Sequence, residues 1–310
     1  MKLLHILNGD ATLELFKQTE IQGDLFVWRE ILCEGPTHPQ VGSEAFWQLR
    51  TAFLSTRYPE QAKKYLTAFR QQLRSIDLGS YDEIVLWFEH DLFCQINFLG
   101  VIAWLNHNSH PNQSYSWVRI DKLTNYQDLI GLGEIAPEDY PKLLENRQPL
   151  KRSEIHQIGE LWQIYSSGQH ELLVEKSQAL APEHFPYLTA SLVKHSRRFP
   201  KAENGLNELE ELALKTIAAH KLTDRQLVGQ LLRQDRLYGF GDLQFFDLIH
   251  QLQDLFNSSQ GPLQLNQRGQ DVLEEKAVYV QPATERIHYG GARREDFYWS
   301  EAQQGLVRRA

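Results

Sequence analysis

Short apolar runs alternate with stretches of helical spacing through the first half of the chain. Four of these runs have the length and composition of buried strands, namely residues 3–7, 24–32, 81–88 and 115–120. The segments between them carry apolar side chains three or four positions apart, and the long segment 44–73 breaks at Tyr58-Pro59 because proline cannot continue a helix interior. Strands that alternate with helices predict an α/β domain, Rossmann-like, with a mainly parallel sheet and flanking helices.

Helical spacing predominates in the second half. Further helices are predicted at residues 153–165, 180–199, 207–217, 223–232 and 242–256. Asn207 and Thr223 each open a capping box, which marks a helix start. Residues 286–291 and 297–299 are expected to pair as a terminal hairpin, with Gly290-Gly291 in the turn. Three helices followed by short strands predict a winged-helix-like end.

At about 150 residues per domain, a chain of 310 residues predicts two domains, and the patterns place a helical connector between them. The expected parts are an α/β domain at 1–150, a helical connector at 151–203 and a winged-helix-like domain at 204–310. No apolar run approaches the ~20 residues of a membrane span, and the first apolar run is too short for a signal peptide. Cys33 and Cys94 have neither disulfide nor metal-site spacing, so we expect a cytoplasmic protein with no membrane partner.

Charge argues against nucleic acid as the main partner. The chain has 32 Lys plus Arg against 40 Asp plus Glu, a formal net charge of −8. Proteins that bind nucleic acid normally carry a basic excess, because phosphate neutralisation supplies most of their affinity. The winged-helix-like end nevertheless keeps DNA contact open as an alternative.

Polar and charged residues directly follow three of the predicted strands. The three clusters are Asn8-Gly9-Asp10, then Arg29-Glu30 with Glu34-Gly35-Pro36, then Glu89-His90-Asp91. Parallel strands end at a common edge of the sheet, and ligands bind there near a topological switch point. We therefore expect a small-molecule site on this edge.

The first two clusters suit an anionic ligand only in part. Gly9 permits close backbone approach, and helix amides after it can hold a phosphate. Asp10 repels an anion unless a metal intervenes, and it can instead cap the following helix. Arg29 can clamp a phosphate or carboxylate through two hydrogen bonds, or it can pair with Asp10 or Glu34. The candidate ligand-binding residues are Asn8, Gly9, Arg29, Glu34 and Gly35.

The third cluster, Glu89-His90-Asp91, has the most side chains that could take part in catalysis. His90 can exchange a proton near neutral pH, with a neighbouring carboxylate to orient it. Together with Asp10, the trio could also bind a divalent metal. The structural alternative is that Asp91 caps the next helix and His90 bonds to a loop. The candidate catalytic residues are His90, Asp91, Asp10 and Glu89; a metal and a cofactor are left unassigned.

Two further features have a structural and a functional interpretation. The stretch Gly131-Leu132-Gly133-Glu134 either turns into a capped helix or closes on the sheet edge. Cys94 falls inside a predicted helix and is expected to pack in the core, as free cysteines usually do.

Several ordered motifs resemble one bacterial family. They are His5 to Asp10, Val27 to Pro36, Leu86 to Leu92, Gly131 to Glu138, Phe185 to Leu188, Phe199-Pro200 and Asn204 to Glu210. Together they are similar to the family called domain of unknown function 1835, with its C-terminal companion, domain of unknown function 3658. The resemblance implies a two-domain architecture in a soluble bacterial protein and assigns no reaction.

The sequence leaves three functions open. The first is an enzyme or binding protein for a phosphorylated or nucleotide-like small molecule at the strand-end crevice. The second is a transcriptional regulator or nucleic-acid-associated protein that uses the winged-helix-like domain. The third is a non-catalytic scaffold for protein interactions. The oligomeric state is not predicted.

Overall fold

The computed structural model describes residues 1–108, 110, 112–123, 130–234, 236–257, 261–281 and 286–309. Contacts within the chain form two compact units. The first unit is Met1–Thr189 with Tyr289–Ala292, and the second is Ala190–His288 with Arg293–Ala310. Within the described ranges, none of the helices combines the length and the apolar character that crossing a lipid bilayer requires.

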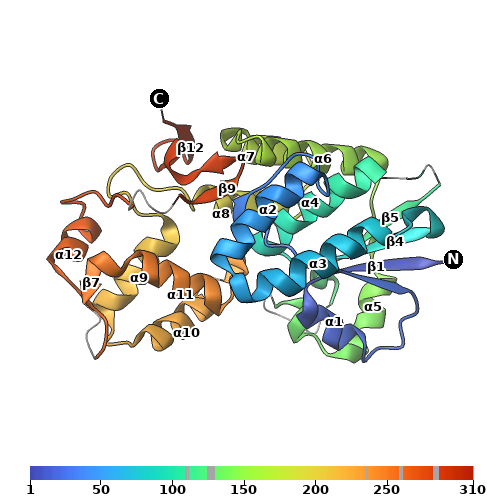
Figure 1. Cartoon of the computed structure of the whole chain (residues 1–310), viewed down its shortest axis with the longest axis horizontal. Coiled ribbons are helices and arrows are strands. Elements are labelled where there is room, and N and C mark those ends of the chain that lie inside the picture. Colours follow the sequence, from blue (N-terminus) through green and yellow to red (C-terminus); the bar gives the residue numbers. More distant parts are fainter. Residues whose placement is uncertain are drawn as a thin grey trace. The chain divides into compact units, whose positions relative to one another are not determined.

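The first unit alternates strands and helices as the apolar pattern predicts (Figure 1). Its elements in chain order are β1 (Leu3–Asn8), α1 (Asp10–Phe16), β2 (Asp24–Trp28), β3 (Gly35–Pro36), α2 (Glu44–Arg57), α3 (Pro59–Ser75), β4 (Glu83–Trp87), α4 (Leu92–Asn108), β5 (Ser114–Val118), α5 (Tyr140–Glu145), β6 (Gln148–Pro149), α6 (Arg152–Ser166), α7 (Leu173–Ser177) and β9 (His288–Gly290). Short 3-10 turns include η2 (Ile120–Lys122), η3 (Leu132–Glu134) and η4 (Pro137–Asp139). The predicted break at Tyr58-Pro59 separates α2 from α3.

A mostly parallel five-stranded sheet forms the centre of this unit. The strand order is β2-β1-β4-β5-β6, in which the first four strands are parallel and β6 runs antiparallel to β5. The register sets Asn8 beside Trp28, and Leu7 beside Trp87, so these strands end at the same edge. This arrangement confirms the α/β, Rossmann-like prediction.

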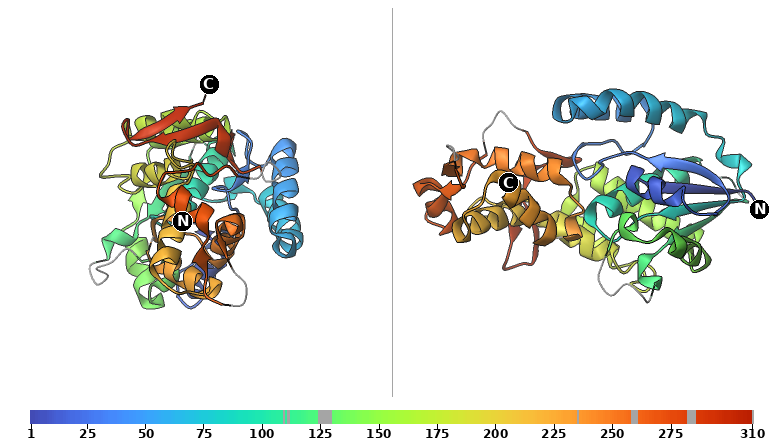
Figure 2. Two further views of the ribbon diagram at one scale, coloured as in Figure 1. Left: turned by 90° about the vertical axis from the view of Figure 1, so that its left-hand side faces the viewer. Right: turned by 90° about the horizontal axis from the view of Figure 1, so that it is seen from below.

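One face of the sheet is covered by α3 and α4. Ile6, Phe26 and Leu86 share this face because they are paired across neighbouring strands. The ring of Phe26 lies 6.0 Å from that of Phe69 in α3 and 5.7 Å from that of Trp104 in α4. Helix α6 packs on α4 on this side, as Figure 1 shows. Figure 2 shows α2 and α3 in blue; they are antiparallel, because Glu44 at the start of α2 pairs with Arg74 near the end of α3.

The opposite face is covered by α1, α5 and the 3-10 turns (Figure 1). Leu7 and Trp87 point to this side and are fully buried. The Trp87 ring lies 5.2 Å from that of Phe16 in α1 and 5.5 Å from that of Tyr140 in α5. Both faces of the sheet are therefore buried, which explains why the strand sequences are almost continuously apolar.

A short strand from near the C-terminus completes the first unit. Tyr289 and Gly290 of β9 pair in parallel with Gly35 and Pro36 of β3. Gly290 has a φ of 61°, and a Cβ there would lie 2.6 Å from the Tyr165 ring. The region 286–291 was expected to pair in a hairpin with 297–299, and this prediction is wrong. Glycine at this position instead allows the chain to pack closely against the end of α6.

The second unit is mainly helical. Its elements are α8 (Leu188–Ser196), of which the residues from Ala190 belong here, then α9 (Glu208–Ala219), α10 (Asp224–Gln234), α11 (Asp242–Gln251), β7 (Phe256–Asn257), β8 (Gln264–Leu265), α12 (Gln267–Leu273), β10 (Ala292–Arg293), of which only Arg293 belongs here, β11 (Phe297–Ser300) and β12 (Gly305–Arg308). Both predicted capping boxes form, at Asn207 and at Thr223. Helices α9 to α11 precede the β7–β8 hairpin. The winged-helix assignment stays a prediction.

Three sequence boundaries differ from the structure. The terminal hairpin is formed by β11 and β12. The helix predicted to open at Leu180-Pro182 begins at Leu188, since turns occupy 182–187. The expected connector 151–203 is divided between the units, because α6 packs on α4 while residues from Ala190 onward join the second unit.

Candidate functional site at the carboxyl ends of the parallel strands

The candidate site lies where the chain order reverses within the sheet. From β1 the chain moves outward to β2 and then returns to place β4 on the other side of β1. This is a topological switch point, and loops that leave β1 and β4 there diverge to opposite faces of the sheet. The structure therefore brings the Asn8-Gly9-Asp10 and Glu89-His90-Asp91 clusters to neighbouring strand ends, as the sequence predicted.

Asp10 begins α1 and pairs with Arg29, which follows β2. Arg29 donates from Nε and Nη2 to the Asp10 carboxylate, at 3.0 and 2.7 Å. The side chains remain 31% and 62% exposed, so solvent reaches the pair. The expected alternative, in which Arg29 is held by an ion pair, is the arrangement found. Such a half-exposed pair can exchange its carboxylate for that of a ligand at small cost, since surface pairs contribute about 0–1 kcal/mol.

Glu89, which is partly buried, forms a cluster with the buried side chains of Asp91 and Cys94. One ligand atom from each side chain lies within 4.8 Å of the others. Asp91 caps α4, because its Oδ1 accepts from the backbone N–H of Cys94 at 2.7 Å. The capping alternative for Asp91 is thus confirmed, and it places the carboxylate beside the thiol.

Burial controls the protonation of this cluster. It raises the pKa of the Glu89 carboxyl, and the neighbouring Asp91 carboxylate raises it further. Burial also raises the pKa of Asp91 and of the Cys94 thiol. The cluster therefore retains protons at a pH where exposed carboxyl groups have ionised, which is typical of functional carboxyl pairs.

Two asparagines hold the thiol in place. Asn8, at the end of β1, donates from Nδ2 to Cys94 Sγ at 2.8 Å. Asn97 of α4 donates to Asn8 Oδ1 at 2.9 Å and to the carbonyl of Glu30 at 2.6 Å. The second asparagine thereby fixes the amide orientation of the first. Sequence reasoning assigned Asn8 to the site but missed Cys94 and Asn97. The usable signal was the three-residue spacing from Asp91 to Cys94, which puts both on one side of a helix start.

The 131–134 loop closes on the sheet edge against this cluster, and it also forms the capped turn that was the other expectation, because the Gly131 N–H donates to Glu134 Oε1 at 3.3 Å. The backbone N–H of Leu132 donates to Glu89 Oε1 at 2.8 Å. A Cβ on Gly131 would lie 2.8 Å from Glu89 Oε2, and one on Gly133 would lie 3.4 Å from the Cβ of Ala11. Glycine at 131 is therefore what permits the loop to approach the carboxylate.

His90 is 5% exposed and stands apart from the carboxylate–thiol group. Its ring lies 5.7 Å from that of Tyr187, which is in edge-to-face orientation. Burial raises the pKa of Tyr187 to about 12, so its hydroxyl stays protonated. The three predicted side chains therefore do not form one group. The carboxyl groups of Glu89 and Asp91 lie near Cys94, and the imidazole of His90 lies against Tyr187.

Glu34 and Gly35 belong to a separate network around Arg50. Glu34 accepts from the Tyr58 hydroxyl at 2.5 Å, and its backbone carbonyl accepts from Arg50 at 2.6 Å. Gly35 has a φ of 73°, and a Cβ there would lie 2.4 Å from Phe53. These contacts give both residues a packing role, and their predicted part in ligand binding stays a prediction.

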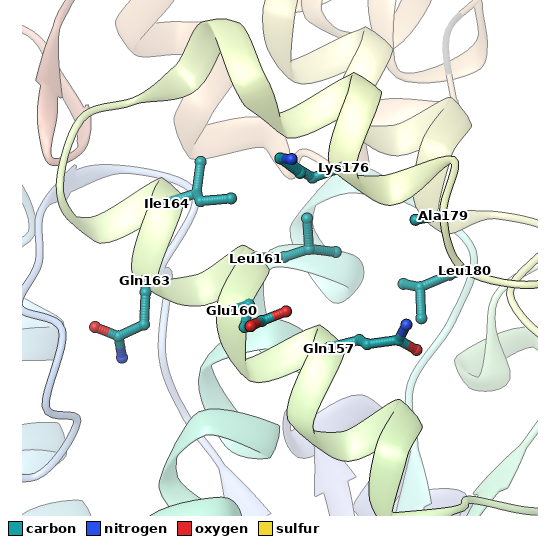
Figure 3. A pocket seen from close by; sticks show the side chains of 8 residues that line it. All are labelled: Gln157, Glu160, Leu161, Gln163, Ile164, Lys176, Ala179 and Leu180. Carbon is teal, nitrogen blue, oxygen red and sulfur yellow. The ribbon is translucent and has the colours of Figure 1, made fainter.

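Two hollows occur away from the strand ends. The first, of about 390 Å³, lies between α6 and the α7 region (Figure 3) and is lined by Gln157, Glu160, Leu161, Gln163, Ile164, Lys176, Ala179 and Leu180. The second, of about 630 Å³, is lined partly by Arg70 and Arg74, which already share the carboxylate of Glu44. Neither hollow gathers the residues that the sequence singled out, so the strand-end cluster remains the better candidate.

Comparison with known proteins gives no family assignment: no protein-family model matches the chain, and no curated protein matches it. The resemblance to domain of unknown function 1835 therefore stays a prediction.

Proposed function

We propose that the chain is an enzyme or ligand-binding protein for a small phosphorylated or nucleotide-like molecule, which binds at the carboxyl ends of β1 and β4. The observation that carries the proposal is the switch point, which delivers Gly9-Asp10 and Glu89-His90-Asp91 to adjacent strand ends. In open parallel sheets this is the position at which small ligands bind.

Arg29 is the residue that would hold the phosphate. It presents a planar guanidinium on the neighbouring strand end and already makes bidentate contact with a carboxylate. A phosphate would replace Asp10 as its partner. Gly9 adds open space at the same turn, since a Cβ there would meet nothing within 4 Å.

The groups available for chemistry lie on the other side of the ligand position. Glu89, His90 and Asp91 follow β4, the strand next to β1. An anionic ligand near these carboxyl groups requires compensating positive charge. Arg29 supplies one unit of that charge once it releases Asp10, whose carboxylate is 62% exposed and is then left to the solvent.

A thermal-shift screen of the full chain tests the proposal. The panel contains nucleotides and sugar phosphates, each beside its unphosphorylated counterpart, with and without divalent metal. A ligand at 100 times its Kd stabilises a protein by about 2.7 kcal/mol, which raises the Tm of a unit of this size by roughly 5–11 °C. We expect such a shift for a phosphorylated compound and not for its counterpart.

Arg29→Met and Arg74→Met form a matched pair of variants. Each removes an arginine that solvent reaches, 31% exposed at position 29 and 58% at position 74, and that is paired with one carboxylate, Asp10 or Glu44. We expect Arg29→Met to abolish the ligand-induced shift and Arg74→Met to retain it. The proposal fails if no phosphorylated compound raises the Tm, or if the shift is the same in both variants.

A further inference from the structure

We propose that Glu89, Asp91 and Cys94 form a binding site for a divalent transition-metal ion of the zinc type, with Gln95 Oε1 as a fourth donor. The site lies at the same strand ends as the proposed ligand site, and it stands on its own contacts, so it does not need the phosphorylated ligand.

The three side chains are already gathered to within reach of one ion. Their ligand atoms lie within 4.8 Å of one another. In zinc sites each donor lies about 2.0–2.3 Å from the ion, so neighbouring donors are about 3–4 Å apart. Closing the cluster around an ion thus requires movements of about 1 Å, which side-chain rotation supplies.

Gln95, next to Cys94 in the sequence, provides an independent indication of a bound cation, because it has a buried acceptor oxygen with no hydrogen-bond donor among the described residues. Its side chain is fully buried, and Nε2 donates to the backbone carbonyl of Glu89 at 2.5 Å. This bond holds the amide head beside the backbone of Glu89. The Oε1 atom on the same head is buried and accepts no hydrogen bond from any residue that the structure describes. A buried acceptor without a donor is unfavourable, and a cation beside Glu89 would satisfy it.

The surroundings orient the donors as the second shell of a metal site does. The backbone N–H of Leu132 fixes Glu89, and that of Cys94 fixes Asp91. The Nδ2 of Asn8 donates to Cys94 Sγ, where it would stabilise negative charge on the sulfur. Each donor side chain thus has one backbone or amide contact that sets its direction.

Charge favours occupation by a cation. Two carboxylates and a thiolate within this volume would repel one another strongly, and a divalent ion offsets most of that repulsion. Binding breaks the Cys94 S–H bond and the O–H bond of each carboxyl group that is still protonated, forms metal–sulfur and metal–oxygen bonds and releases these protons to the buffer, so no oxidant or reductant is needed. A thiolate donor favours zinc, cobalt or iron over magnesium, which prefers oxygen donors alone.

Cobalt(II) and zinc titrations of the chelator-stripped full chain test the site, with no phosphorylated compound present. We expect one ion per chain and, with cobalt, a thiolate-to-metal charge-transfer band in the near ultraviolet. Cys94→Ser should abolish the band, while Cys33→Ser should retain it. Cys33 is the matched control because it is also a buried free cysteine.

Glu89→Gln decides the matter if Cys94→Ser does not fold. The amide keeps the size and the acceptor oxygen that Leu132 uses, and we expect zinc affinity to fall at least about tenfold. The site is refuted if the wild-type chain takes up no stoichiometric ion, if the band survives Cys94→Ser, or if zinc affinity is unchanged in Glu89→Gln. If the chain binds the ion but no phosphorylated compound raises its Tm, the metal site is supported and the phosphorylated ligand is refuted. If a phosphorylated compound raises the Tm but the chain binds no ion, the metal site is refuted and the phosphorylated ligand is supported.

Discussion

The buried ion pair of Glu30 and Arg50 offers the sharpest test of how the strand-end loops are held. Both side chains are 0% exposed. Arg50 donates to the Glu30 carboxylate from Nε at 3.1 Å and from Nη2 at 2.9 Å. It also donates to three backbone carbonyls, those of Ile31, Glu34 and Pro36. One side chain therefore ties together the segment that follows β2.

Arg50→Met keeps most of the aliphatic stem and removes all these donors. It leaves the Glu30 carboxylate buried without its ion-pair partner, a change that costs about 3–5 kcal/mol in other buried pairs. A unit of about 190 residues loses roughly 2–4 °C of Tm per kcal/mol, so we expect a fall of about 6–20 °C.

Thermal unfolding of Arg50→Met beside Arg74→Met measures the effect. Arg74 pairs with Glu44 but is 58% exposed, so its loss should cost less than about 1 kcal/mol. The double variant Glu30→Gln/Arg50→Met should cost clearly less than the sum of the two single changes, because each partner is needed only while the other is charged. A Tm for Arg50→Met within experimental error of that for Arg74→Met would refute the reasoning.

Two further changes probe the sheet and the loop. Burial lowers the pKa of His5, so its contribution to stability is complete above pH 6.5 and is lost as the pH falls toward the folded-state pKa. His5→Phe should therefore flatten the decline of Tm below pH 6.5, and an unchanged slope would count against a buried neutral imidazole. Gly131→Ala puts a Cβ 2.8 Å from Glu89 Oε2, whereas Gly133→Ala makes ordinary contact at 3.4 Å. Zinc affinity measured by calorimetry should fall about tenfold, or 1.4 kcal/mol, in the first variant and stay unchanged in the second.

Local patterns in the sequence were enough to predict the four parallel strands of the sheet and the edge at which they end, but not the short antiparallel strand β6. Apolar runs as short as Leu3 to Leu7 mark buried strands because both faces of this sheet are covered. The parallel direction of these strands then follows from the helices that connect them. Helix capping at Asn207 and Thr223 was also predictable from local sequence, because the donor and the acceptor of each capping bond lie three residues apart.

The composition of the site depended on contacts that no local pattern carries. Cys94 had been expected to act only as core packing, yet its sulfur accepts from Asn8, which lies 86 positions earlier. Glu89 is held by Leu132 from 43 positions later. The imidazole of His90 faces Tyr187 because the turns before α8 lie beside it. Spacing along the chain cannot give such pairings without knowledge of how the loops fold back.

The pairing of β9 with β3 has a consequence for how the protein is made. Tyr289–Ala292 belongs to the first unit, although almost a hundred residues of the second unit precede it in the sequence. During synthesis, β3 of the first unit therefore cannot pair with β9 until residue 290 has left the ribosome. A chain released early, at any point within the second unit, would carry an unpaired edge at Gly35-Pro36 that is open to proteases and to other nascent chains.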